Sequence, residues 1–374
     1  MRAGQFIFGL FLLLWAERVC AQLNNRVFED RMAVEEADSG KLYAGVNALG
    51  FFKNNEYVRT IIDGYTLFGY QFQPFLSYHV SKNVRMDVGA YFQQDFGNSK
   101  LSTTAPIFSI KWRKKEYSVI FGNLESSLNH RLIEPLYDFE RVLTNRLETG
   151  VQLQINREDL FVDVWIDWQY MQYWRDPRQE QLAGGLSLQK RVLKFSGGSS
   201  LSIPVQIMAR HQGGQLDVAG LPIQTLVNTA TGLVWTQPTQ GWAKQLTFSG
   251  YYVFDKDITK TRQAYLDGDS FYLNGTVSTK FGLDIMASYW QGREFMSFQG
   301  GKTYQAVSYF DPRRIQPSTQ LMILRFMYDY KVTDNLYLTL RYEPYYDIAF
   351  QSFQYSYALY INYRDRYFLA KRKK

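Results

Sequence analysis

The sequence predicts an all-β protein, a single transmembrane antiparallel up-and-down β-barrel of about 16 strands. Three observations lead to this prediction. Segments of about ten residues alternate apolar and polar side chains, the turns between them alternate short and long, and a secretion-type N-terminus precedes a chain without further cysteine.

The alternation is clearest in FVDVWIDWQY, residues 161–170. Val162, Val164 and Ile166 fall on one side of an extended chain, and Asp163 and Asp167 fall on the other, because strand side chains alternate with period two. One face therefore suits lipid and the other suits water. The same period recurs over residues 84–93, 146–155, 322–330, 336–343 and 353–364.

The connections supply the second regularity. Short polar turns are expected at 81–83, 113–116, 156–159 and 333–335. Longer connections are expected at 54–64, 95–104, 124–144, 172–181, 213–224, 255–270 and 292–318. Tight turns at one end and long loops at the other are typical of a membrane barrel, and an even strand count puts both termini on the periplasmic side.

The N-terminus predicts export. Arg2 precedes an apolar run from Phe6 to Trp15, and Val19-Cys20-Ala21 supplies a cleavage site, so residues 1–21 are interpreted as a signal peptide. Acylation of Cys20, as in a lipoprotein, is a weaker alternative. Residues 22–40 form a polar lead-in, either a short helix or a disordered stretch, and residues 41–374 form the barrel with a short basic C-terminal tail.

Composition excludes several function classes. Cys20 is the only cysteine and would leave with the signal peptide, so disulfides, cysteine-bound metals and catalytic thiols are not expected. No ligand cluster suggests a metal or cofactor, and a net charge of +7 over 374 residues does not indicate nucleic acid. A secreted β-sandwich would also alternate, but 17% aromatic residues, many at strand ends, favour the lipid boundary of a barrel.

With these strands and loops, the chain resembles the porin-like outer-membrane β-barrels of Gram-negative bacteria over residues 41–368. The resemblance implies an outer-membrane location and contacts with lipopolysaccharide and other outer-membrane lipids. It also implies handling by the barrel-insertion machinery, for which Phe368 is the expected signal although six residues follow it. Homo-oligomers are common among such porins, and nothing in the sequence identifies a protomer interface.

Charged residues on the polar face would point into the lumen of such a barrel. The expected lumen charges are Arg85, Asp87, Arg146, Glu148, Asp163, Asp167, Arg325, Asp329, Arg341, Glu343 and Arg364. A barrel of this size leaves room for water, so these charges would sort solutes in an open pore. In the alternative, they pair with one another and fill the interior.

The third long connection, residues 124–144, is unusually apolar for an exposed loop. In many porin-like barrels the third outer loop folds inward and narrows the channel. By that resemblance, the constriction candidates are Arg131, Glu134, Asp138, Glu140 and Arg141. A packed cap over the mouth is the alternative.

Two further loop features bear on function. The seventh long connection carries Arg293, Lys302, Arg313 and Arg314, which would be solvated or would contact lipopolysaccharide phosphates. His130 shares the third loop with Ser126 and Ser127, which are residue types for an activated nucleophile, but no nucleophile motif surrounds them.

The resulting expectation is a channel for passive or weakly selective passage of small hydrophilic solutes, with no catalytic residues and no enzymatic activity. Two alternatives stay open. One is a barrel with a plugged lumen that serves as a subunit of an outer-membrane assembly or transport complex. The other is a barrel hydrolase.

Overall fold

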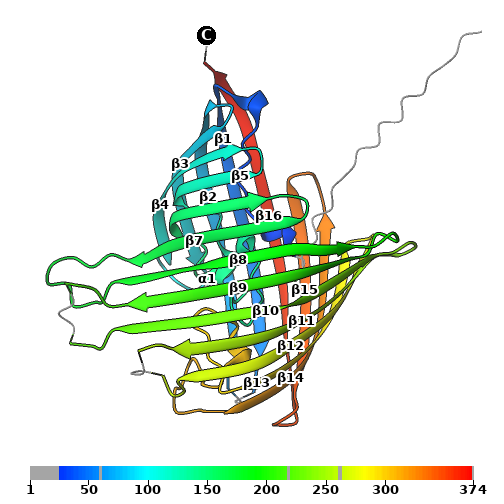
Figure 1. Cartoon of the computed structure of the whole chain (residues 1–374). Coiled ribbons are helices and arrows are strands. Elements are labelled where there is room, and N and C mark those ends of the chain that lie inside the picture. Colours follow the sequence, from blue (N-terminus) through cyan, green and yellow to red (C-terminus); the bar gives the residue numbers. More distant parts are fainter. Residues whose placement is uncertain (1–24, 59–60, 217–219, 260–262, 373–374) are drawn as a thin grey trace, which may run out of the picture.

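The computed structural model describes residues 25–58, 61–216, 220–259 and 263–372, and within them the chain forms one closed barrel of antiparallel strands (Figure 1). Each strand pairs with its sequence neighbours, and β1 pairs with β16 to close the sheet. The predicted all-β up-and-down barrel of about 16 strands is therefore confirmed. No helix of the described residues is long and apolar enough to cross a membrane.

The first eight strands are β1 (Lys41–Glu56), β2 (Tyr65–Ser81), β3 (Val84–Asp95), β4 (Thr103–Lys114), β5 (Tyr117–Asn123), β6 (Thr149–Asn156), β7 (Leu160–Tyr170) and β8 (Gln181–Lys194). The second eight are β9 (Ser200–Gln212), β10 (Gln224–Pro238), β11 (Ala243–Asp257), β12 (Asp267–Thr279), β13 (Leu283–Arg293), β14 (Ser318–Lys331), β15 (Leu336–Asp347) and β16 (Ser352–Lys371). The helices are single turns: η1 (Arg26–Phe28), η2 (Glu36–Asp38), η3 (Ser127–His130), α1 (Arg141–Thr144) and η4 (Lys302–Tyr304).

Strand β7 shows how the alternating sequence produces the wall. Asp163, Trp165 and Asp167 are buried inside the barrel, whereas Val164 and Ile166 are exposed on its outer surface. Only an apolar outer face is compatible with lipid, and the closed ladder leaves no unpaired strand edge in the membrane. The same pattern explains the low mean hydropathy of −0.31, since half of each strand is polar.

The turns divide the barrel into two ends. The turns β2–β3, β4–β5, β6–β7 and β14–β15 span 82–83, 115–116, 157–159 and 332–335. The long connections lie at the opposite end. The two longest of them are the third loop, residues 124–148, and the seventh loop, residues 294–317.

Both of these loops fold into the lumen. The apolar residues of the third loop that looked unusual in the sequence are buried there: Leu132, Ile133 and Leu136 pack against wall residues such as Trp165 and Met208. Phe295 and Tyr304 of the seventh loop join the same core. The barrel therefore has an interior core near its outer end, where an empty porin would hold water.

Residues 25–34 also lie inside the barrel, and residues 35–40 lead from them to the start of β1. Phe28 packs edge-on against Phe139 of the third loop and Tyr360 of β16, with ring centroids 5.2 and 5.1 Å away. Asn362 donates to the Val27 carbonyl at 2.6 Å, and Arg85 donates to the Ala33 carbonyl at 3.1 Å. We call residues 25–38 the N-terminal segment. The predicted signal peptide lies outside the described residues.

Candidate functional site

The outer half of the lumen contains a cluster centred on Lys302 of the seventh loop. Its ammonium group lies 2.7 Å from Glu140 Oε2 and 3.3 Å from Asp138 Oδ2, both on the third loop. The Lys53 ammonium group of β1 lies 2.9 Å from Glu140 Oε1 and forms a second ion pair. Tyr65 of β2 donates its hydroxyl to Glu140. We call these five residues the Lys302 cluster.

Neighbouring charges set the protonation of this cluster. Burial alone would raise the pKa of Glu140, but Lys53 and Lys302 hold it below its ordinary value. Burial would lower the pKa of Lys302, but Asp138 and Glu140 raise it. The cluster therefore holds fixed charges of both signs across the neutral pH range.

The Lys302 cluster lies between two cavities. Outside it, a cavity of about 890 Å³ opens at the barrel mouth, and Tyr65, Asp138, Glu140 and Lys302 line its floor. The same four residues line an inner cavity of about 40 Å³. The cluster is therefore the boundary between the mouth and the interior.

A second boundary follows inward at Glu134. Its carboxylate accepts hydrogen bonds from the Arg325 guanidinium of β14 and from the Tyr304 hydroxyl, the latter at 2.8 Å. Arg325 also pairs with Glu343 at 3.1 Å. Burial raises the pKa of Glu134, and Arg325 opposes that rise. Glu134 lines both the 40 Å³ cavity and a further one of about 20 Å³.

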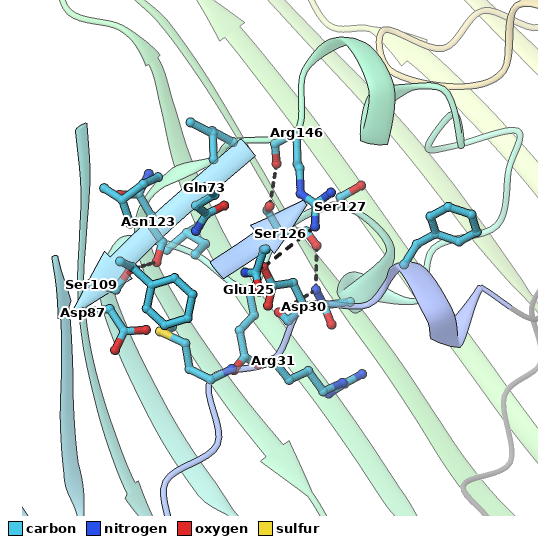
Figure 2. A pocket seen from close by; sticks show the side chains of 18 of the residues that line it. Asp30, Arg31, Gln73, Asp87, Ser109, Asn123, Glu125, Ser126, Ser127 and Arg146 are labelled. Carbon is cyan, nitrogen blue, oxygen red and sulfur yellow. Dashed lines mark hydrogen bonds and ion pairs between the residues drawn. The ribbon is translucent and has the colours of Figure 1, made fainter. Parts of the chain in front are cut away.

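The last cavity lies beneath the third loop, next to the N-terminal segment, and has a volume of about 70 Å³ (Figure 2). Glu125 lies at its centre, where it accepts the Met32 backbone N–H at 2.7 Å and the Lys111 ammonium. Asp30 and Arg146 also line it, 3.8 Å apart. Phe28 lines this cavity and Phe139 lines the preceding one, so their contact separates the two.

The five predicted constriction residues divide into two groups. Glu134, Asp138 and Glu140 line the cavities and pair with cations from the wall and the seventh loop. Arg131 and Arg141 instead lie over aromatic rings, although Arg141 also lines the outer cavity. The Arg131 guanidinium lies 3.8 Å from the centre of the Phe161 ring, and that of Arg141 lies 5.0 Å from the Tyr137 ring.

His130 fixes the third loop to the wall. Its Nδ1 lies 2.9 Å from Asp163 and its Nε2 lies 2.7 Å from Glu148, and its ring stacks on Trp165 at 3.8 Å. Burial would lower the pKa of His130, but the two carboxylates raise it to about 10. The imidazole is therefore a cation held between two anions. We call His130, Glu148, Asp163 and Trp165 the His130 clamp.

The remaining predicted lumen charges are held by near neighbours. Arg85 forms a two-point pair with Asp87 at 2.8 Å. Asp167 accepts the Thr149 N–H at 2.8 Å, and Asp329 accepts the Thr339 hydroxyl at 2.7 Å. Arg146, Arg341 and Arg364 contact the N-terminal segment, as Arg85 also does.

A serine–histidine pair does not form in the third loop. Both ring nitrogens of His130 face carboxylates, and the Ser126 hydroxyl donates to the Arg146 carbonyl at 2.7 Å. A histidine that is already protonated and enclosed cannot take a proton from serine. The residues considered for a hydrolase in this loop therefore have a structural role.

Sequence reasoning missed three parts of this interior. The expectation for Lys302 is a solvated loop or a contact with lipopolysaccharide, but its side chain is only 20% exposed and lies in the lumen, whereas that of Arg313 is 90% exposed. Lys53 was not singled out. Its side chain and that of the adjacent Asn54 point to opposite faces of the strand, and a lysine is expected on the face toward the lumen. The N-terminal segment was read only as a polar lead-in, and Phe28 was the one hint that it packs.

Comparison with solved structures shows the same architecture. The outer membrane protein OprD from Pseudomonas aeruginosa aligns with a TM-score of 0.55 at 12% identity, covering 90% of this chain and 97% of that one. A loop L8 deletion mutant of OmpT from Vibrio cholerae aligns with a TM-score of 0.53 at 11% identity, covering 88% and 100%. At such identities the likeness concerns the fold, and the predicted resemblance to porin-like barrels is confirmed.

Sequence comparison gives the family. The model of the family described as Lipid A 3'-O-deacylase-type matches residues 34–372, which include every strand of the barrel. The chain belongs to this family. No curated protein sequence matches it.

The family membership corrects one expectation. The sequence analysis assigned no enzymatic activity, and this was wrong, because the family is an enzyme family named for a deacylase. The physical reason for the error is that the sequence shows no nucleophile motif, and that His79 and His211 fall in expected strands, where His211 has no hydroxyl partner close in sequence. Pairs formed across two strands leave no such local motif.

Proposed function

We propose that the barrel passes small hydrophilic solutes across the outer membrane along a narrow, charge-lined route. The observation that carries this proposal is the sequence of cavities of about 890, 40, 20 and 70 Å³ from the mouth inward. Solutes would meet fixed charges at the Lys302 cluster and at Glu134, which favours selective over general passage. The porin-like fold supports the same reading.

In the conformation described, the route is narrow because three segments share the lumen. Passage requires displacement of one of them, and the N-terminal segment is the natural candidate, since its contacts with Phe139 separate the last two cavities. The function is therefore that of a gated channel with small resting conductance.

The test is single-channel recording of the purified protein in a planar bilayer, beside a variant lacking residues 25–38. The intact protein is expected to give small discrete steps and the deletion variant larger ones. Phe28→Ala is a milder version that keeps the segment. Insertion of both proteins without current would contradict the proposal and favour the assembly subunit with a plugged lumen.

A second candidate, acyl-ester hydrolysis on a lipid, is favoured by one contact. His211 Nδ1 of β9 lies 2.9 Å from Thr225 Oγ1 of β10. Their neighbours Arg210 and Gln224 face the lumen, so His211 and Thr225 face outward, close to the ends of their strands at the loop side. A hydroxyl paired with a histidine has the residue types of an activated nucleophile.

In this reaction the Thr225 oxygen attacks the acyl carbonyl while His211 Nδ1 takes the hydroxyl proton. The His211 proton then passes to the departing alcohol oxygen, and water hydrolyses the acyl-threonine to release a fatty acid. The family description suggests the 3'-O-acyl chain of lipid A as the substrate.

Mass spectrometry of lipid A from cells expressing each variant tests this candidate. The intact chain is expected to remove one ester-linked acyl chain, and Thr225→Ala and His211→Ala are expected to abolish the removal. Thr231→Ala, on the same strand and face, is the matched control and should keep it. Unchanged lipid A in cells with the intact chain would refute deacylation.

A further inference from the structure

The outer cavity has the size of a binding site as well as of an entrance. Its volume of about 890 Å³ falls in the range of small-molecule sites, about 300 to 1,000 Å³. It is bounded by the third loop, by the seventh loop and by residues 65–67 and 263–264. The proposed transport function uses it only as the mouth of the route.

The charges that line this cavity are balanced and already engaged. They are Asp138, Glu140, Arg141 and Lys302, two of each sign. Lys302 pairs with both acids, and Arg141 lies over the Tyr137 ring. A charged solute would have to displace one of these partners, whereas a neutral solute would not.

Aromatic faces are the second feature of the lining. Tyr309 and Phe310 are 73% and 48% exposed although both are large rings. Their centroids lie 5.4 Å apart and their planes are perpendicular, so they present two differently oriented faces to the hollow. Phe298 adds a third ring to the lining. Exposed rings grouped in a hollow indicate a ligand with apolar surface.

Polar groups beside these rings supply hydrogen bonds. The side-chain amides of Asn145, Gln263 and Gln299 line the same cavity and can each donate and accept. A ligand that matches this lining is neutral, has flat apolar faces and carries many hydroxyl groups. Pyranose rings have these properties, because their C–H faces stack on aromatic rings while their edges form hydrogen bonds.

We propose that the outer cavity binds a neutral oligosaccharide, stacked on Tyr309 and Phe310 and hydrogen-bonded by Asn145, Gln263 and Gln299. This inference deepens the proposed channel function and rests on it for the role of binding, which is to concentrate the solute at the entrance. Binding itself does not require that the channel conduct.

Isothermal titration calorimetry of the full chain in detergent tests the proposal. The neutral probes are maltotriose, cellotriose and isomaltotriose, and the charged probes of similar size are triarginine and trigalacturonate. At least one neutral probe is expected to bind at least tenfold more tightly than either charged probe. Absence of binding by all three neutral sugars, or equal binding of a charged probe, would overturn it.

Variants locate the site. The double variant Tyr309→Ala/Phe310→Ala is expected to lower the sugar affinity at least tenfold. Phe281→Ala is the matched control, because Phe281 is 57% exposed in the turn between β12 and β13 at the other end of the barrel. Equal loss in both variants, or none in the double variant, would overturn the assignment.

Conductance separates the two proposals. If the sugar binds by calorimetry but no current flows in any condition, the channel function fails and the binding site stands. If the barrel conducts and no neutral sugar binds or blocks the current from the loop side, the binding site fails and the channel function stands.

Discussion

The His130 clamp and the Lys302 cluster have the same chemistry and different surroundings. Each places a cation between two carboxylates. The first joins the third loop to strand β7, and the second joins the seventh loop to the third. The His130 clamp is fully buried, with exposures of 0 to 1% for its charged side chains. The Lys302 cluster lines two cavities, and its lysine is 20% exposed. The first arrangement fastens the third loop, and the second borders the proposed solute route.

The largest effect is expected from His130→Ala. This variant leaves Glu148 and Asp163 buried without their cation, which typically costs roughly 3 to 5 kcal/mol. The midpoint of urea unfolding in lipid vesicles should fall, and single-channel current should become noisier as the third loop loosens. Lys100→Ala, on an exposed connection, is the control. An unchanged midpoint would show that the clamp does not hold the loop.

The charge of His130 can also be removed by pH. Its pKa is raised from 6.5 to about 10 in the folded state, so its contribution to stability is complete below pH 6.5 and is lost as pH rises through about 10. Unfolding midpoints measured at pH 6.5, 8 and 10 should fall with rising pH. His130→Gln replaces the imidazole with an uncharged side chain of similar size. The unfolding midpoint of this variant should fall less as the pH rises. Parallel curves for both proteins would contradict the assignment.

Gly300→Ala tests the contact between the third and seventh loops without touching a charge. A Cβ at Gly300 would lie 1.8 Å from the Pro135 carbonyl oxygen, so the loops must separate. Strain of this kind typically costs about 1 to 3 kcal/mol, and the conductance should rise. Gly197→Ala is the matched control because nothing lies within 4 Å of its added Cβ. Equal conductance in the two variants would argue against a barrier at this contact.

The smallest effect is expected from Glu140→Gln in the Lys302 cluster. One negative charge about 4 Å from a hydrated ion is worth about 1 kcal/mol, or about a fivefold change in the permeability ratio, here in favour of anions. Reversal potentials in asymmetric KCl measure the ratio. Glu56→Gln, in an exposed position at the outer end of β1, is the control. A shift toward cations would place the charge selection elsewhere.

The wall of the barrel could be predicted from sequence because its rule is local. Period two over residues 161–170 is enough to assign which side chains face lipid and which face the lumen. The inward fold of the third loop was also predictable, since Leu132, Ile133 and Leu136 have no other place to be buried.

Contacts between distant segments were not predictable in the same way. Lys302 and Glu140 are 162 residues apart, and no periodicity links them. The seventh loop is mostly polar, so it gave no sign that it enters the lumen. The outward pair of His211 and Thr225 depends on the register of β9 with β10, which the sequence does not specify to one residue.

The N-terminal segment has a mechanical consequence for the barrel. Fifteen of the sixteen strand junctions join neighbours that are consecutive in the chain, and the junction of β1 with β16 has hydrogen bonds alone. The segment crosses this junction from inside: Asp30 accepts Asn47 of β1 at 2.8 Å, and Val27 and Glu29 accept Asn362 and Arg364 of β16. The segment therefore stabilises the junction of β1 with β16, where the strands would separate first. An opening movement of this segment would leave the barrel less resistant to rupture at that junction.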